Sequence, residues 1–522
     1  MVVSWIEQAK QFKSPLSVVA GFLLRSRETQ AERAKSRTQE IQQLKKALEQ
    51  QQRTIREQRE QLAEKNLQIA RMQIENQRLR TQPPTLPDDP LLPHHEFGPK
   101  MISLCVNLAR RIGLRPTPDV LKMILEWLGV DAKLPDWTTV RTWMLRVGVA
   151  AIKRPIEEAD DWIWMADHSN QIGPEKALAI IGLRASKMPP PGQALTHEDV
   201  RVLELSPGTS WKREDMAVAY EQLAQRCGTP LGIVVDGAVE LREGVEMAEM
   251  PRDKGQNTIV LGDFKHYAAN VLKKIVGKDE RFPQFSTQLG RTRSAIQQTE
   301  LAHFTPPNAK PKARFMNLKP TLAWAKMVSW QLSHPQSQGR QNITAERMNN
   351  KLGWLREFRD DIDRWHACQQ VVSASSTFIN EQGLFRGAAR QLRDHLRTLR
   401  NGDDNKEAKN TKDSRHVTAS LLRFVRQSES KLAAGQRLPM STEILESSFG
   451  LFKQLERQHS KGGFTSLLAA YGCLLHVSTP ESIRRDFAQV TVKDIRDWVS
   501  AKLGKTLASK RQTAYQEFRN AA

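Results

Sequence analysis

Cysteine is scarce in this chain, and its few copies form no recognisable pair. The four cysteines lie far apart, without a Cys-x-x-Cys motif, at Cys105, Cys227, Cys368 and Cys473. Neither a disulfide framework nor a thiolate zinc site is indicated by this spacing. The pattern fits a protein of a reducing compartment.

A long apolar run is also missing. The run SPLSVVAGFLL, residues 14–24, is shorter than the roughly 20 residues that a membrane-spanning helix needs. Charged residues follow it, and no small-residue cleavage site is present. We expect a short packing helix there, within an N-terminal helical segment at residues 1–26, and we expect no membrane partner.

Acidic residues are too few to balance the basic ones. The chain has 79 Lys and Arg against 58 Asp and Glu, which gives a net charge of +21. Such an excess favours a polyanionic partner, because basic side chains neutralise phosphates and release counterions. The alternative is a basic protein that is merely soluble. With 522 residues, 39% of them hydrophobic, the chain can build several cores.

Glycine and proline are almost absent from residues 27–81, where a seven-residue repeat is present instead. Its a positions are Ile41, Leu48, Ile55, Leu62, Ile69 and Asn76. Its d positions are Leu44, Gln51, Gln58, Lys65, Met72 and Leu79. The apolar a seam predicts a coiled coil that forms a homodimer or higher oligomer, and Asn76 favours a parallel dimer. Because the middle d positions are polar, a long solvated single helix is the alternative.

A proline-rich linker, residues 82–99, separates the repeat from a run of short helices at residues 100–155. Asp136 is a suitable N-cap for the last of these helices. Short helices joined by tight turns predict a helix-turn-helix domain whose last helix contacts DNA. Its candidate contacts are Thr138, Thr139, Arg141, Thr142 and Arg146. The alternative is a helical bundle whose tryptophans are core residues.

From residue 156 the pattern changes to strands. Three strand-like runs come first, and two more follow with helices between them: 162–167, 177–185, 200–206, 231–238 and 257–264. Antiparallel hairpins followed by crossover units predict a mixed α/β sheet, in the order found in ribonuclease H-like domains. We expect this core at residues 156–289 and 436–522, with a basic C-terminal tail. An all-helical insertion is expected at residues 290–435, with an exposed loop at 401–414.

Carboxylates follow two strands that this order makes neighbours. Asp167 ends the first strand and Asp236 ends the fourth, so both side chains can face one another at one edge of the sheet. Glu446, on a late helix that Ser441 or Thr442 can cap, would complete a cage of three acids. Such hard oxygen ligands suit Mg²⁺, for which Mn²⁺ can substitute. A pair of such ions assists in-line phosphoryl transfer.

The ordered set resembles the DDE transposases of bacterial insertion sequences, which have a ribonuclease H-like catalytic core. MADHSNQIG (165–173) is similar to the strand with the first Asp, IVVDGAVELREGVE (233–246) to the second, and STEILESSFGLFK (441–453) to the Glu helix. Glu446 and Lys453 show the Glu-x6-Lys spacing of one transposase group. That group also has Tyr and Arg upstream, where this chain has Thr442 and Glu443. The subgroup therefore stays open, and Glu443 is a rival for the third acid.

Three further residues have two interpretations each. Asp263 ends the fifth strand, and His266 follows three residues later. We interpret Asp263 as a helix N-cap or as a residue that hydrogen-bonds to the metal ligands, and direct metal ligation is the alternative. Trp324 and Trp330 lie six apart in the insertion. The resemblance implies an aromatic residue that stacks on a displaced base near the cut, whereas a core role is the ordinary one.

The resemblance covers residues 160–280 and 436–475, and it implies a DNA transposase. Asp167, Asp236 and Glu446 would then be the catalytic metal ligands for strand cleavage and strand transfer, with Lys453 on a DNA phosphate. The partner would be double-stranded DNA, both element ends and target, and the location cytoplasmic and nucleoid-associated. Two alternatives are a non-catalytic DNA-binding protein derived from a transposase and a ribonuclease H-like nuclease. The whole chain is thus expected to be a multidomain α/β protein.

Overall fold

A computed structural model describes residues 15–81, 88–168, 175–251, 257–308, 315, 318–334, 345–402, 411–457, 464–504 and 507–521. The chain divides into two compact units. One comprises Met1–Leu86 and Glu126–Asp131, and the other Pro87–Leu125 and Ala132–Ala522. Within the described ranges, no helix is both long and apolar enough to cross a membrane.

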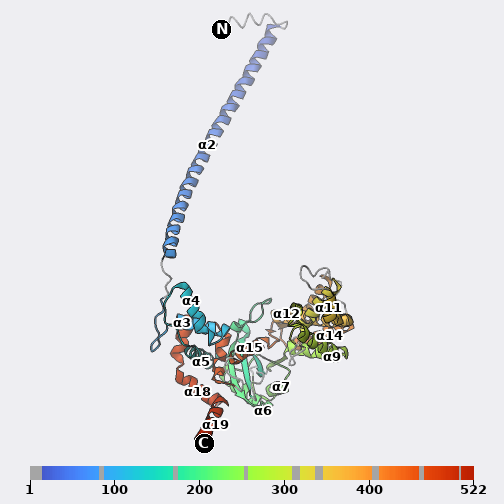
Figure 1. The fold of residues 1–522 in the computed structure, drawn as a ribbon. Coiled ribbons are helices and arrows are strands. Elements are labelled where there is room, and N and C mark those ends of the chain that lie inside the picture. Colours follow the sequence, from blue (N-terminus) through green and yellow to red (C-terminus); the bar gives the residue numbers. More distant parts are fainter. Residues whose placement is uncertain are drawn as a thin grey trace. The chain divides into compact units, whose positions relative to one another are not determined.

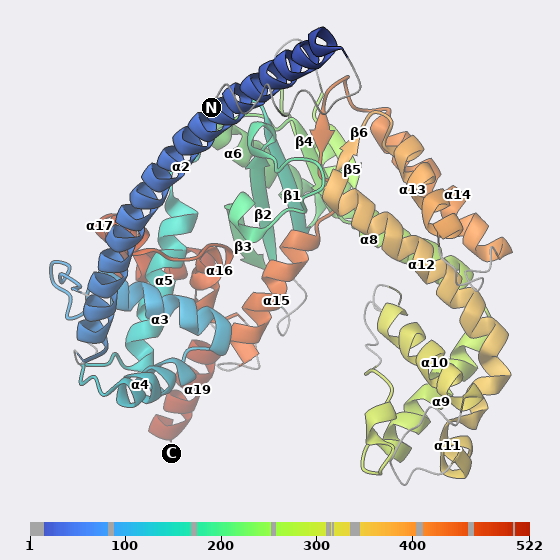
Figure 2. The same ribbon diagram turned by 90° about the horizontal axis from the view of Figure 1, so that it is seen from above.

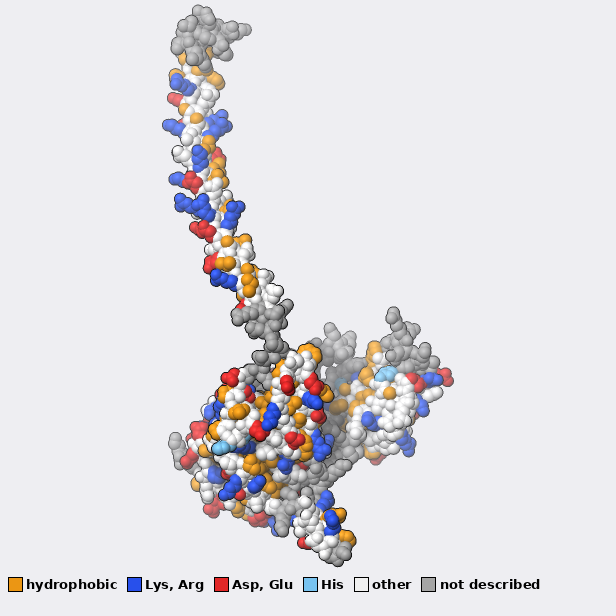
Figure 3. All heavy atoms as spheres, turned by 60° about the vertical axis from the view of Figure 1, so that its left-hand side comes forward, with side chains coloured by type: hydrophobic (Ala, Val, Ile, Leu, Met, Phe, Trp, Pro, Cys, Tyr) orange, Lys and Arg blue, Asp and Glu red, His pale blue; other side chains and the backbone are white. Residues whose placement is uncertain are grey.

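The N-terminal unit contains one unbroken helix, α2 (Leu16–Thr81, 66 residues), shown in blue in Figure 1. The helix predicted over 27–81 is confirmed. The separate packing helix predicted at 14–24 is wrong, because these residues from Leu16 on are the first turns of α2. Val18 and Phe22 are 57% and 70% exposed, so they are not packed. Figure 3 shows hydrophobic side chains on the surface of this helix. The exposed ones include the apolar a positions Ile41, Leu48, Ile55, Leu62 and Ile69.

Three helices open the larger unit: α3 (Pro99–Ile112), α4 (Pro116–Leu128) and α5 (Trp137–Lys153). Asp136 caps α5, as predicted, because its side chain accepts a hydrogen bond from the N–H of Thr138 at 2.7 Å. The C-terminal helices of the same unit are η7 (Ser466–Ala470), α16 (Tyr471–Leu475), α17 (Pro480–Gln489), α18 (Val492–Leu503) and α19 (Leu507–Ala521).

The helices at 100–155 do not form a separate domain. α5 packs against η7, α16, α17 and α18, and α3 packs against α17. Nearly all residues of α5 from Val140 to Ala150 are buried. The predicted domain boundary at residue 155 is therefore wrong. The helices α3, α4 and α5 share one hydrophobic core with the helices from η7 to α18, which follow more than 300 residues later.

A five-stranded mixed sheet lies at the centre of this unit (Figure 2). Its strands are β1 (Trp162–His168), β2 (Lys176–Arg184), β3 (Arg201–Gly208), β4 (Gly232–Val235) and β5 (Ile259–Gly262). Their order is β3-β2-β1-β4-β5, with β1, β2 and β3 antiparallel and β1, β4 and β5 parallel. Both the five predicted strands and the predicted pairing of the first with the fourth are confirmed.

The sheet has helices on both faces because its strands are apolar on both faces. One face buries Trp162 and Trp164, and Trp164 stacks on Tyr220 with ring centroids 6.4 Å apart. α6 (Arg213–Cys227) and α7 (Val239–Met247) contribute to this side. The opposite face belongs to the larger core, which includes residues of α5, α8 (Phe264–Ile275) and α15 (Glu443–Arg457).

The described residues of the insertion form the helices α9 (Arg281–Ile296), α10 (Leu318–Ser333), α11 (Ala345–Leu352), α12 (Arg359–Gln382), α13 (Ala388–Gly402) and α14 (Lys412–Glu429). Short 3-10 turns accompany them at Ala302–Phe304 and Gly353–Phe358. The prediction of an all-helical insertion is wrong in one detail. A short strand in it, β6 (Leu384–Phe385), pairs antiparallel with β7 (Arg437–Leu438). Most of the predicted loop at 401–414 lies outside the described residues.

Candidate active site

Two aspartates lie side by side at the carboxyl edge of the parallel strands. Ala166 of β1 pairs with Val235 of β4, so the residues that follow them, Asp167 and Asp236, are neighbours across the two strands. Side chains alternate between the faces of a sheet. Asp167 therefore lies on the same face as Met165, and Asp236 on the face of Val234, which is the face of the larger core. The predicted position of the two aspartates at the ends of adjacent strands is confirmed, and their catalytic role stays a prediction.

Backbone N–H groups hold both carboxylates. The N–H of His168 donates to Asp167 at 2.7 Å, and the N–H of Ala238 donates to Asp236 at 2.6 Å. Asp167 is only 8% exposed. Burial, and then the negative charges of Asp236 and Glu446, raise the pKa of Asp167 to about 8. A nearby cation stabilises the ionised form of a buried carboxyl group that has acidic neighbours. The charges at this edge of the sheet therefore favour the binding of a cation.

Glu446 comes to the same region on α15. This helix packs against β1, and the hydroxyl of Ser448 forms a hydrogen bond with that of the fully buried Tyr471. The negative charge of Glu446 contributes to the raised pKa of Asp167. In this conformation, however, its carboxylate lies 3.0 Å from Nζ of Lys265 and 3.5 Å from Nε2 of His266.

Asp263 follows β5 and is the next residue along the same edge, because Val235 pairs with Gly262. Its carboxylate accepts hydrogen bonds from the N–H of His266 at 2.6 Å and from the hydroxyl of Thr442 at 2.8 Å. Burial raises the pKa of Asp263, but the hydrogen bond and charge of the His266 side chain, followed by the N–H groups of Thr442 and His266, hold it below its usual value. Asp263 is thus the N-cap of α8, as predicted, and it ties the start of α15 to that helix.

The side chain of His266 is strongly coupled to these acids. Burial lowers its pKa, but the bond to Asp263 and the charges of Asp263, Glu446 and Asp236 raise it to about 9. Nδ1 of His266 lies 3.2 Å from Asp263. The imidazole lies between the N-cap of α8 and the carboxylate of Glu446, and both acids favour its protonated form.

The donor set fits a hard divalent cation in its chemistry and in the placement of the two aspartates. The third acid is not turned toward them. Among the described residues, no three His, Cys, Asp or Glu side chains are grouped closely enough to hold a metal ion. A cage of all three acids at this edge therefore requires Glu446 to leave Lys265 and His266.

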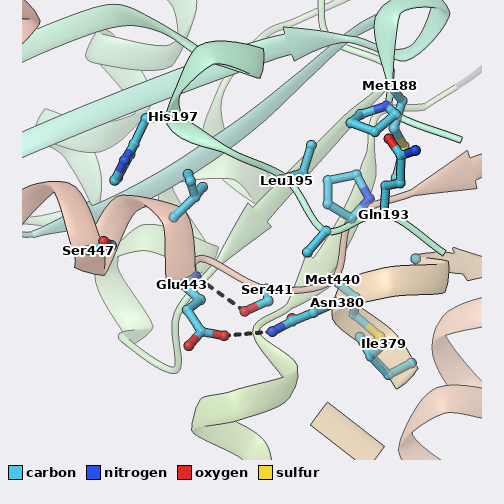
Figure 4. A pocket seen from close by; sticks show the side chains of 15 residues that line it. Met188, Gln193, Leu195, His197, Ile379, Asn380, Met440, Ser441, Glu443 and Ser447 are labelled. Carbon is cyan, nitrogen blue, oxygen red and sulfur yellow. Dashed lines mark hydrogen bonds between the residues drawn. The ribbon is translucent and has the colours of Figure 1, made fainter. Parts of the chain in front are cut away.

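Glu443 is engaged elsewhere. Its carboxylate accepts a hydrogen bond from Nδ2 of Asn380 at 2.6 Å and lies 3.3 Å from Nζ of Lys265. Figure 4 shows the bond to Asn380, and a second one from the Glu443 N–H to the hydroxyl of Ser441. Glu443 lines a cavity of about 420 Å³ formed with residues of the β2 to β3 connection and the end of α12, among them Leu195, His197 and Ile379.

Two of the five predicted DNA contacts on α5, Arg141 and Arg146, form hydrogen bonds within the protein. Arg146 is 9% exposed, and its guanidinium donates to the carbonyls of Val490 and Phe487. Arg141 donates to the hydroxyl of Ser466. Arg146 cannot reach DNA from this position, and its predicted role is wrong because α5 is a central core helix. Thr138, Thr139 and Thr142 are near the start of the same helix and are exposed or half-buried.

The two tryptophans of α10 differ in burial. Trp324 is 7% exposed, and its indole N–H donates to the carbonyl of Phe304 at 2.8 Å, so the core interpretation holds for it and the base-stacking one does not. Trp330 is 51% exposed and stacks on His334 with ring centroids 4.6 Å apart. Lys453 is half-buried on α15, two turns after Glu446.

Sequence reasoning missed Lys265 and Asn380. Lys265 contacts both glutamates of α15, and Asn380 comes from the long insertion helix α12. Neither residue belongs to a motif. Their common partner, Glu443, lies 178 residues after Lys265 and 63 residues after Asn380 in the sequence. The spacing of His266 after Asp263 was the only local signal in this part of the site.

No protein-family model matches this sequence, and no curated protein is significantly similar to it. Among solved structures, the chain is similar to one described as the Drosophila P element transposase strand transfer complex. That similarity has a TM-score of 0.37 and 12% sequence identity, and it covers 75% of this chain and 94% of the other.

Proposed function

We propose that this protein is a DDE-type DNA transposase with a ribonuclease H-like core, which cuts DNA at element ends and joins it to a target. One observation carries the proposal. Asp167 and Asp236 end adjacent parallel strands and lie on the face where α15 brings Glu446. Open α/β sheets bind their ligands at the carboxyl ends of the parallel strands, and this acidic cluster lies there. A strongly shifted pKa, such as that of Asp167, is typical of a functional site.

Asp167, Asp236 and Glu446 would hold Mg²⁺ or Mn²⁺. When bound, two such ions activate the attacking hydroxyl and stabilise the leaving oxygen of an in-line phosphoryl transfer. The backbone bonds to Asp167 and Asp236 fix the direction of both carboxylates, and the burial of Asp167 strengthens its hold on a cation by lowering the local dielectric. Glu446 is the movable member of the set.

The net charge of +21 supports double-stranded DNA as the partner, and association with the nucleoid follows from that partner. Lys453, on the same helix as Glu446, is a candidate contact for a DNA phosphate. The exposed a positions of α2 support a homodimer or higher oligomer through a coiled coil.

A non-catalytic DNA-binding protein derived from a transposase is the second candidate. It is favoured by the ion pairs that hold Glu446 away from the aspartates, since Lys265 and His266 both contact its carboxylate. A protein that keeps the sheet only as a scaffold has no need to free Glu446.

The test uses DNA that carries the ends of the element that encodes the protein, incubated with Mg²⁺ or Mn²⁺. We expect nicking or joining that excess EDTA abolishes, and undiminished activity with EDTA would contradict the metal mechanism. Asp167→Asn and Glu446→Gln should reduce cleavage and joining by orders of magnitude, while end binding in a gel shift persists.

Glu443→Gln is the matched control on the same helix, and we expect it to keep most of the activity because Glu443 is anchored to Asn380. Loss of activity in Glu443→Gln with an active Glu446→Gln would transfer the ligand role. End binding without cleavage by the wild-type protein would favour the non-catalytic candidate.

A further inference from the structure

Lys265 lies between the two glutamates of α15. Its Nζ is 3.0 Å from Glu446 and 3.3 Å from Glu443, and its side chain is 28% exposed. Although burial lowers the pKa of Lys265, the charges of Glu446 and Glu443 raise it above its usual value. Lys265 thus places a positive charge beside the candidate metal site. It contacts Glu446, which belongs to the site, and Glu443, which does not.

The two glutamates differ in what else holds them. Glu443 accepts a bond from Asn380 at 2.6 Å (Figure 4), and its N–H is bonded to Ser441. Its carboxylate would therefore stay in place if Lys265 moved. The carboxylate of Glu446 is contacted by Lys265 and His266, and both contacts would be broken when Glu446 turns toward a metal ion.

The aspartates stand in contrast to Glu446. Within the described residues, neither Asp167 nor Asp236 forms an ion pair, and their carboxylates accept hydrogen bonds from the N–H groups of His168 and Ala238. Among the three acids, Glu446 is therefore the one whose carboxylate is in direct contact with basic side chains, those of Lys265 and His266. Turning Glu446 toward the aspartates exchanges its contact with an ammonium for one with a divalent ion.

We propose that Lys265 is a resident counter-cation for Glu446, that a divalent cation displaces it, and that Glu443, anchored by Asn380, retains it beside the site. The proposal rests on the proposed function, because it takes Glu446 as a metal ligand. Like charges repel, so an ammonium and a divalent ion compete for one carboxylate. The flexible stem of a lysine allows its ammonium to move from one carboxylate to the next.

The test measures Mn²⁺ binding to the full chain without DNA, from the loss of the electron paramagnetic resonance signal of free Mn²⁺. We expect Lys265→Met to bind Mn²⁺ about three- to tenfold more tightly than wild type, because a competing ion pair is removed. Glu443→Gln should bind it two- to fivefold more weakly, because the displaced ammonium loses its second partner. Lys274→Met, an exposed lysine of the same helix α8, is the matched control and should match wild type.

A double variant separates a positioning role of Glu443 from a direct one. If Glu443 acts only by retaining Lys265, then Glu443→Gln has no further effect on Mn²⁺ affinity in the Lys265→Met background. Affinity that is unchanged or weaker in Lys265→Met overturns the proposal. An equal loss from Glu443→Gln in both backgrounds overturns the retaining role.

Asp167→Asn distinguishes failure of this proposal from failure of the proposed function. Tight Mn²⁺ binding that is lost in Asp167→Asn but indifferent to Lys265→Met upholds the metal site and removes only the role of Lys265. Binding by Lys265→Met but not by wild type supports the competition directly. No binding by any of these proteins at millimolar Mn²⁺ overturns both.

Discussion

The helices α2 and α5 both have sequences that suggest contact with a partner, yet they differ completely in burial. α2 runs for 66 residues with its apolar side chains exposed, Ile55 at 48% and Leu62 at 63%. α5 runs for 17 residues and buries even an arginine, since Arg146 is 9% exposed. A helix that is apolar on one narrow stripe needs a partner helix, whereas one that is apolar all round is a core helix.

The sequence of α5 already contains this distinction. Apart from Arg146, residues 143–151 (WMLRVGVAA) are apolar and leave no polar face. Thr and Arg near the start of the helix suggested contacts with DNA, but the burial of the following two turns decides where the helix lies. The difference between the two helices can be tested by substitutions whose effects should be large in α5 and small in α2.

The largest effect is expected from Gly148→Ala. A Cβ at Gly148 would overlap the backbone carbonyl of Ala469 and lie 2.7 Å from Cα of Ala470, so α5 and η7 would have to separate. We expect a loss of about 3 kcal/mol in the free energy of unfolding, measured by urea denaturation. Gly450→Ala in α15 is the control, because nothing lies within 4 Å of its Cβ. Equal stability of the two variants would contradict the close packing of α5.

Arg146→Met should come next. The substitution keeps an apolar stem but removes the donors to the carbonyls of Val490 and Phe487, and buried unpaired carbonyls cost about 1 to 3 kcal/mol. Arg59→Met, on the exposed surface of α2, should change stability by less than about 0.5 kcal/mol.

A second readout of Arg146→Met is the pKa of His95, which burial and then the charge of Arg146 lower. Without that charge the pKa should rise toward its ordinary value, measured by NMR titration. A stable Arg146→Met variant with an unchanged His95 would mean that Arg146 does not occupy this buried position.

The strands and the two aspartates could be predicted because their signals are local. Alternation, turn residues and crossover lengths gave the strand order, and that order alone made Asp167 and Asp236 neighbours. The N-caps Asp136 and Asp263 were also visible, because a cap acts within three residues of itself.

The rest depends on contacts between distant segments. Lys265 meets Glu446 across 181 residues and Arg146 meets Val490 across 344, and no local pattern encodes such pairs. The core shared by α5 and the C-terminal helices could not be predicted for the same reason. Association of α2 and metal binding at the sheet edge stay predictions.

The self-association of α2 is tested by Ile55→Asp with Leu62→Asp. Two charges at a positions should dissociate a coiled coil, so light scattering should show the mass of a monomer. The unfolding of the larger unit should not change, because residues 55 and 62 belong to the other unit. Gln42→Asp with Gln50→Asp adds the same charges outside the a and d positions and should leave the mass as in wild type. An unchanged mass in both variants would support the solvated single helix.

The smallest effect is expected from Gly21→Ala in α2. Here the substitution that breaks α5 should be favourable, since the atom nearest to the new Cβ is Nη2 of Arg25 at 3.9 Å. Alanine costs less backbone entropy than glycine in a helix, by roughly 0.5 to 1 kcal/mol, which slows amide exchange about two- to fivefold. Hydrogen exchange measured by mass spectrometry over residues 18–28 should show this slowing in the full chain. Faster exchange would mean that another segment packs closely against Gly21, and the apolar start of α2 would then be covered, as the core helix α5 is.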